Sequence, residues 1–154
     1  MTAYSLDTSA ILDGWVRYYA PDVFPSFWLK LESLLDDGGA RISKQVHVEL
    51  SEQDDGAADW VNERGAAVVE IDEAAFAIAQ AIDKQFPGWV TKKKNGADPF
   101  VIALAEIEGL KVITGERRKG TDNPKRMGIP DVCAKRHIDC GAMVDLIREE
   151  GWSF

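Results

Sequence analysis

The chain alternates short apolar, β-branched runs with longer segments of helical periodicity. Strands are predicted at about residues 3–7, 40–43, 67–71 and 111–114, with a short edge strand at 137–140. Helices are predicted at 26–35, 46–51, 57–64, 72–86, 100–108, 131–136 and 141–150. Strands that alternate with helices form parallel sheets covered on both faces. We therefore expect an α/β chain with a three-layer α/β/α fold around a twisted parallel sheet of about four or five strands.

Length and composition fit one ordinary globular domain over residues 1–154. Of these residues, 45% are hydrophobic and 29% are charged, as in soluble proteins. No apolar run approaches the ~18 residues of a membrane span, and the N-terminus lacks the pattern of a secretory leader. We therefore expect a cytoplasmic protein with no membrane partner. Cys133 and Cys140 are too few for a disulfide framework, which agrees with a reducing compartment.

The formal net charge of −8 argues against a surface coated with phosphate-binding groups. Basic residues are nevertheless concentrated in two places. One is Lys92–Lys94, and the other is a ten-residue stretch with five basic residues and one acid, Asp122. Those five are Arg117, Arg118, Lys119, Lys125 and Arg126. Each cluster is compatible with a solvated loop or with a site that binds phosphates.

Four acids stand where the predicted strands end or the predicted helices begin. Asp7 ends the first strand, Glu49 lies on the helix after the second, Asp98 opens the helix at 100–108, and Glu116 follows the strand at 111–114. In open α/β sheets, ligands bind beyond the carboxyl ends of the strands, where these positions converge. Carboxylates held close together repel unless a cation lies between them. An all-oxygen ligand set suits Mg²⁺ or Mn²⁺.

Each acid also has a structural explanation when it is taken alone. Asp98 before Pro99 has the form of a helix N-cap, Glu49 can be a solvated helix residue, and Glu116 can be a turn residue. Asp7 is the hardest to explain in this way, because a carboxylate at the end of a buried strand is costly unless it is paired.

The order and spacing of these acids resemble the PIN-domain nucleases, including the VapC-like toxins of toxin–antitoxin pairs. The resemblance covers nearly the whole chain, and the part from Ile129 to Phe154 is similar to a separate PIN-like subfamily. The segments that carry it are Leu6-Asp7-Thr8-Ser9, Val48-Glu49-Leu50, Ala97-Asp98-Pro99-Phe100-Val101-Ile102-Ala103-Leu104-Ala105 and Val112-Ile113-Thr114-Gly115-Glu116. One position departs from the pattern, because the toxins usually carry Asp where this chain has Glu116. Asp122 is therefore an alternative fourth acid.

The resemblance implies a metal-dependent endoribonuclease, the toxin of a toxin–antitoxin pair. Asp7, Glu49, Asp98 and Glu116 would be the catalytic and metal-binding residues, with one or two Mg²⁺ or Mn²⁺ ions. The metal would generate a nucleophilic hydroxide near neutral pH and stabilise charge on the phosphate. Three hydroxyl residues would orient the carboxylates by hydrogen bonds: Thr8, Ser9 and Thr114. The structural alternative is that Thr8 or Ser9 caps the first helix and that Thr114 completes the hydrogen bonding at the end of its strand. The implied partners are RNA, an antitoxin and, in many toxins, a second copy of the chain.

Arg117, Arg118, Lys119, Lys125 and Arg126 would then hold the RNA backbone near the cut, since phosphate contacts position a strand without reading its sequence. Trp89 and Phe100 can stack on a base or belong to the core. A second group of aromatic residues crowds the first helical region and would form a partner surface if it is exposed: Trp15, Tyr18, Tyr19, Phe24, Phe27 and Trp28.

Other functions remain open at this stage. A PIN-like protein without catalysis would act only as an RNA- or protein-binding module. A phosphatase of the haloacid-dehalogenase type needs a second acid two residues after the first, where this chain has Ser9, and a receiver domain needs an acidic pair that is missing. A zinc site at Cys133, His137 and Cys140 lacks an evident fourth ligand, so packing explains these residues better.

Overall fold

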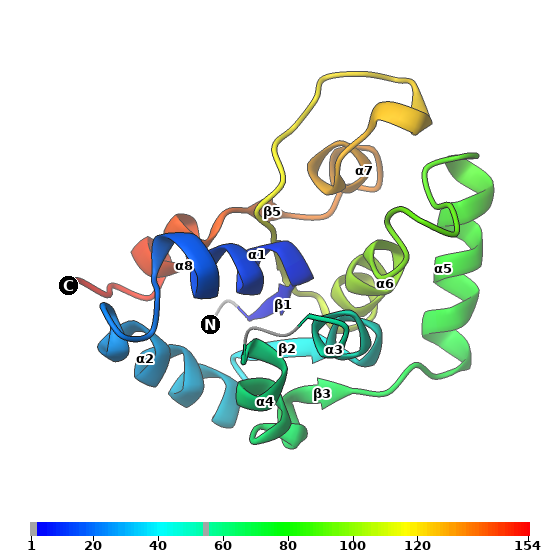
Figure 1. Cartoon of the computed structure of the whole chain (residues 1–154). Coiled ribbons are helices and arrows are strands. Elements are labelled where there is room, and N and C mark those ends of the chain that lie inside the picture. Colours follow the sequence, from blue (N-terminus) through cyan, green and yellow to red (C-terminus); the bar gives the residue numbers. More distant parts are fainter. Residues whose placement is uncertain (1–2, 54–55) are drawn as a thin grey trace.

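A computed structural model describes residues 3–53 and 56–154. Its centre is a five-stranded sheet with the order β3-β2-β1-β4-β5, in which all four neighbouring pairs are parallel. The strands are β1 (Tyr4–Leu6), β2 (Ala40–Ser43), β3 (Val68–Val69), β4 (Lys111–Ile113) and β5 (Cys140–Gly141). The sheet lies between helices on both faces (Figure 1), which confirms the predicted three-layer α/β/α fold.

Helices and helical turns fill the connections between the strands. They are α1 (Thr8–Asp13), the π-helical turn η1 (Gly14–Tyr18), α2 (Pro25–Asp36), α3 (Lys44–Ser51), α4 (Ala57–Asn62), the 3₁₀ turn η2 (Gly65–Ala67), α5 (Glu73–Gln85), α6 (Asp98–Glu108), the 3₁₀ turn η3 (Pro124–Arg126), α7 (Ile129–Lys135) and α8 (Met143–Glu149). Among the described helices, none combines the length and the apolar character that crossing a membrane requires.

The central strand β1 is buried on both faces, as expected for a parallel sheet between helical layers. Tyr4, Ser5 and Leu6 are all fully buried. On one face, α6 packs across β1, β2 and β4, and α5 packs against α6. The Ser5 hydroxyl donates to the carbonyl of Val101 at 2.9 Å, so β1 and α6 are joined by a buried hydrogen bond as well as by apolar contact. This packing fixes the C-terminal end of β1 relative to α6.

The two edge strands are shorter than or displaced from their predictions. The strand predicted at 67–71 is reduced to Val68–Val69, because η2 occupies the residues before it and Asp72 already caps α5 through the Ala75 N–H. The strand predicted at 137–140 lies at Cys140–Gly141. The chain turns first at His137, whose φ of 59° is the left-handed conformation.

Candidate metal centre

Three carboxylates from different parts of the chain meet at the carboxyl edge of the sheet. Asp7 follows β1, Asp98 begins α6, and Glu116 lies three residues after the end of β4. One oxygen of each lies within 4.8 Å of the other two, a spacing at which the group can hold a metal ion. Among residues 3–53 and 56–154, no other group of three potential ligands meets this condition.

Asp7 is held in place by the hydroxyls around it. The residue is 2% exposed, and its Oδ2 accepts hydrogen bonds from Ser9 Oγ at 2.6 Å and Thr114 Oγ1 at 2.8 Å. Burial raises the pKa of Asp7 above its usual value; these two hydrogen bonds oppose the rise, and the charge of Glu49 adds to it. The prediction that Thr8 or Ser9 caps the first helix is wrong. Asp7 itself precedes α1, without a side-chain capping bond, and both hydroxyls point to carboxylates.

Asp98 is not the helix cap that its sequence position suggested. The N-cap of α6 is Ala97, and Asp98 is the first residue of the helix and makes no capping bond. The residue is 7% exposed. Burial, followed by the charges of Asp7, Glu116 and Glu49, raises the pKa of Asp98 to about 9. Asp98 is buried beside other acids and does not cap the helix, so it is a candidate metal ligand.

Glu116 completes the group from the segment after β4. Burial and the charge of Asp7 raise its pKa to about 7, while the backbone N–H of Ile129 and the cations Lys119 and Lys94 act in the opposite direction. Its own N–H donates to Thr114 Oγ1 at 3.1 Å. Thr114 therefore contacts both acids and couples the position of Asp7 to that of the segment carrying Glu116.

Asp122, the alternative fourth acid, lies elsewhere. Its carboxylate forms an ion pair with Lys135 Nζ at 2.7 Å on the surface, and its side chain is 93% exposed. Of the two candidates, only Glu116 belongs to the acidic group.

Glu49 lies beside the three carboxylates but outside the group defined by their spacing. Its Oε2 accepts from Thr8 Oγ1 at 2.8 Å, and its Oε1 accepts from the N–H of Ala97 at 2.9 Å. Because Ala97 is the N-cap of α6, Glu49 joins the start of α1 to the start of α6. It therefore fixes the start of α1, which follows Asp7, relative to the start of α6, which carries Asp98.

The composition of the group fits a hard divalent cation. All its potential ligand atoms are carboxylate oxygens. One of the three carboxylates, that of Asp7, is oriented by hydrogen bonds from Ser9 and Thr114. The raised pKa values show that burial and mutual repulsion disfavour the charged forms. A cation among the three oxygens removes this repulsion, which is the usual condition for keeping several acids in one buried site.

The segment between β4 and α7 carries the five predicted RNA-binding residues and arches away from the sheet (Figure 1). All five are exposed: Arg117, Arg118, Lys119, Lys125 and Arg126. None of them forms an ion pair within the described parts of the chain. Their positive charges are therefore available to a ligand beside the acidic group.

Asp131, which the sequence analysis did not single out, holds this arch in place. Its carboxylate accepts from the backbone N–H groups of Lys119, Gly120 and Gly128 at 2.8–3.1 Å. The spacing from Gly128 to Asp131 is that of an acid three residues after a helix N-cap, a pattern visible in the sequence. The same residue thus caps α7 and fixes the basic segment.

The other basic cluster, Lys92–Lys94, lies beside Glu49. These lysines line a cleft of about 430 Å³ together with Thr8, Glu49 and residues of α3. Lys94 Nζ also donates to the carbonyl of Lys125 at 2.8 Å, so the two basic clusters are in direct contact. Positive charge from both clusters therefore lies near the acids, and Lys94 and Lys119 both oppose the rise that burial causes in the pKa of Glu116.

The structure also shows which of the predicted aromatic residues are exposed and where the proposed zinc ligands lie. Of the two alternatives for Trp89, stacking on a base or a place in the core, the structure shows the core: Trp89 is fully buried and donates its indole N–H to the carbonyl of Met127 at 3.0 Å. Phe100 is partly exposed. In the first helical region Phe27 and Trp28 are core residues, whereas Tyr18 is exposed. His137 lies beyond the end of α7, and Cys133, His137 and Cys140 are not among the close groups of potential metal ligands in the described chain.

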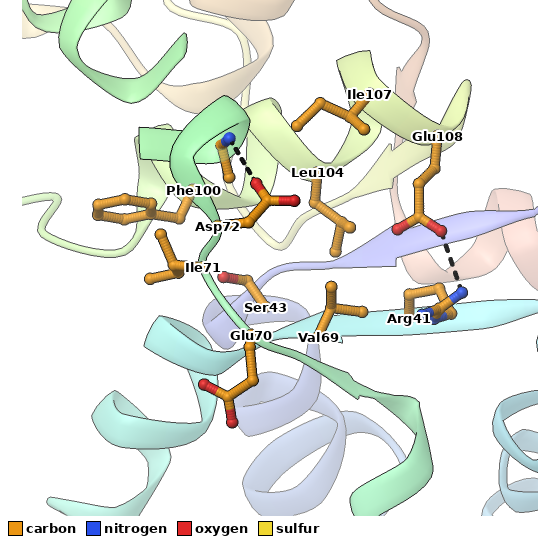
Figure 2. Close-up of a pocket in the computed structure, with 11 residues that line it drawn as sticks. Arg41, Ser43, Val69, Glu70, Ile71, Asp72, Phe100, Leu104, Ile107 and Glu108 are labelled. Carbon is orange, nitrogen blue, oxygen red and sulfur yellow. Dashed lines mark hydrogen bonds and ion pairs between the residues drawn. The ribbon is translucent and has the colours of Figure 1, made fainter. Parts of the chain in front are cut away.

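Figure 2 shows a separate hollow between β2, β3 and α6, with a volume of about 190 Å³. It contains none of the three acids. Its charged groups are largely satisfied: Arg41 pairs with Glu108 at 3.0 Å, and Asp72 accepts the Ala75 N–H at 2.8 Å. This hollow has no group of titratable residues comparable to the metal centre.

Comparison with protein-family models matches residues 4–154 to the family described as Domain of unknown function (DUF4411). A comparison with curated proteins found no match. The matched range includes Asp7, Asp98 and Glu116 and both basic clusters, so the whole arrangement described above lies within one family domain.

Proposed function

The chain belongs to the DUF4411 family, and we propose that it is a metal-dependent endoribonuclease of the PIN type. The observation that carries the proposal is the meeting of Asp7, Asp98 and Glu116 within 4.8 Å at the carboxyl edge of a parallel sheet. We propose Mg²⁺ or Mn²⁺ as the ion, because oxygen-only ligand sets favour these metals. The resemblance to PIN nucleases in the order of the acids supports the assignment of RNA as the substrate.

In this proposal the chain's own residues position the acids. Thr114 and Ser9 hold Asp7 by donating hydrogen bonds to its Oδ2. Glu49 fixes the start of α6 and with it Asp98. The bound ion would supply a hydroxide near neutral pH and neutralise charge on the phosphate in the transition state.

The basic residues around the acids would bind the RNA backbone. Glu116 is followed directly by Arg117, Arg118 and Lys119. The charges of Lys119 and Lys94 oppose the rise that burial causes in the pKa of Glu116. Such contacts position a strand electrostatically and weaken with salt. Local positive charge thereby offsets the overall charge of −8 for a polyanionic substrate.

The cellular role that we propose follows from the resemblance to VapC-like toxins. On that basis we propose that the chain is the toxin of a toxin–antitoxin pair, that an antitoxin protein covers its site and that it works in the cytoplasm, as a dimer in the manner of these toxins. Induced expression should arrest growth, and the Asp98→Asn variant should not. Equal arrest by both would contradict the toxin role.

The direct test is cleavage of single-stranded RNA by the full chain with Mg²⁺ or Mn²⁺. The Asp7→Asn and Asp98→Asn variants should each lose at least ~100-fold in rate, the scale seen when one electrostatic group is removed from an active site. Asp122→Asn is the matched control, since it makes the same chemical change at an exposed ion pair.

Two outcomes oppose the proposal. Equal cutting by the wild type and both variants would mean that the acidic group is not the active site. An inactive wild-type protein that still binds RNA or a protein partner would favour the alternative function, a PIN-like binding module without catalysis.

A further inference from the structure

A second hollow, of about 210 Å³, lies against the metal centre on the side of α1 and α8. Its wall includes Thr114, the residue whose hydroxyl donates to Asp7. The opposite walls come from η1 and from the start of α8, which lie near one another in Figure 1. A strand whose phosphate reaches the three acids can therefore place a neighbouring group in this hollow.

The walls of the hollow are largely apolar and partly exposed. Tyr18 is 62% exposed and Val144 is 41% exposed, although both lie beside a charged centre. Ala10 and Met143 extend the same apolar lining. Exposed apolar and aromatic surface next to a phosphate-binding region is typical of sites that stack unpaired bases.

Two charged side chains give the hollow polar character, Asp13 and Arg117. Within the described residues, the carboxylate of Asp13 makes no hydrogen bond or ion pair. It lies directly over Gly115, where a Cβ would be 2.4 Å from its Oδ2. Glycine at position 115 therefore leaves room for an acceptor that nothing in the protein uses.

We propose that this hollow is a nucleobase subsite for the nucleotide next to the scissile phosphate, and that it prefers guanine. The inference rests on the proposed ribonuclease function and adds the base that is read. A carboxylate accepts from the N1–H and N2–H₂ groups of guanine, and a guanidinium donates to its O6 and N7. Asp13 supplies the acceptor and Tyr18 supplies a stacking face. Arg117 lines the same hollow and supplies the donors, so in this proposal it contacts the base, while the other basic residues hold the RNA backbone.

The first test needs no catalysis. Short single-stranded RNAs carrying one 6-thioguanosine are bound to the wild-type chain in EDTA and irradiated. The crosslinked peptides, identified by mass spectrometry, should contain Tyr18 or Met143. Crosslinks confined to the Lys92–Lys94 cleft would overturn the subsite.

The second test measures base preference in cleavage and in binding. Asp13→Asn should reduce the preference for guanine about tenfold, because the amide cannot accept from both donor groups of the base. Tyr18→Ala should weaken binding of guanine-containing RNA about tenfold, and Tyr18→Phe should not, because it keeps the ring. Asp22→Asn, an exposed acid that does not line the hollow, is the matched control.

The two proposals fail in different ways. Metal-dependent cleavage without base preference, unchanged by Asp13→Asn, would overturn the subsite and leave the nuclease. Crosslinks in the hollow without any cleavage would overturn the nuclease and leave a base-binding site.

Discussion

Two sets of buried carboxylates in this fold behave in opposite ways. Asp131 is 4% exposed, and Asp7 is 2% exposed. Burial raises the pKa of Asp131, but the backbone N–H groups of Lys119, Gly128 and Gly120 outweigh it and hold the pKa below its usual value. For Asp7, burial dominates and the pKa is raised.

The difference separates a structural acid from a functional one. Asp131 is surrounded by donors, so its charge is stabilised by the fold itself. Asp98 has other acids as its neighbours, and their charges add to the effect of burial. An unfavourable buried charge that the fold retains calls for a ligand of opposite charge. Substitutions in the acidic group and at Asp131 can test this difference separately.

The largest effect is expected at Glu116, the acid least certain from the sequence. Glu116→Gln should lower the rate of RNA cleavage at least ~100-fold, because a neutral amide cannot balance a cation. The rate is measured under single-turnover conditions with Mn²⁺. Circular dichroism should show an unchanged fold, and a rate close to that of the wild type would remove Glu116 from the centre.

Thr114→Val should have the next largest effect. It removes the hydroxyl that donates to Asp7 Oδ2 while keeping the shape of the side chain. Loss of a partner that orients a metal ligand costs about 10–100-fold in metal affinity. Isothermal titration with Mn²⁺ measures this change, and an unchanged affinity would show that Asp7 needs no orientation from Thr114.

Asp131→Asn should destabilise the fold. An amide presents its NH₂ group to one or more of the backbone donors that now face a carboxylate, at a cost of about 1–3 kcal/mol. Urea unfolding measures this loss. The contribution of Asp131 should be present above the usual pKa of an aspartate and disappear as the pH falls through its lowered value. Unfolding free energies equal to those of the wild type would contradict its structural role.

The metal-free protein should show the opposite pH dependence at Asp98. Its folded pKa of about 9 lies above the usual 3.8, so the folded state binds the proton more tightly and loses stability as the pH rises between these values. Asp98→Asn should therefore raise the melting temperature at pH 8 in EDTA by about 2–4 °C. A lower melting temperature would mean that the charge stabilises the fold, as it does at Asp131.

The smallest effect is expected at Asp122, whose pKa is lowered by the hydrogen bond and charge of Lys135 at the surface. Asp122→Asn should leave the melting temperature, metal affinity and cleavage rate unchanged, since exposed ion pairs contribute little. A loss of metal binding in a calorimetric titration would return Asp122 to the centre.

Strand and helix order were predictable from the sequence because hydrophobic periodicity reports burial directly. Asp7 and Asp98 were also predictable, since they stand at a strand end and a helix start that a parallel sheet brings together. The edge strands were less well predicted: β3 has only two residues, because η2 and the cap at Asp72 take up the neighbouring positions.

The roles of the individual hydroxyls and the identity of the third acid could not be predicted from the sequence. Whether a hydroxyl caps a helix or holds an acid depends on tertiary neighbours, and Thr8 and Ser9 contact Glu49 and Asp7. The choice of Glu116 over Asp122 depended on how the segment after β4 folds, and Asp131 fixes part of that segment by accepting from the backbone N–H groups of Lys119 and Gly120. The buried position of Trp89, whose indole N–H donates to the carbonyl of Met127, also depended on this segment.

The central claim is that Asp7, Asp98 and Glu116 together bind a divalent cation. The most direct measurement is a crystal structure of the protein grown with Mn²⁺, with anomalous scattering used to locate the ion. The account predicts one or two anomalous peaks at coordinating distance from these three carboxylates, and none in crystals of Asp98→Asn. Crystals without a peak there, grown at a Mn²⁺ concentration that supports RNA cleavage, would contradict it.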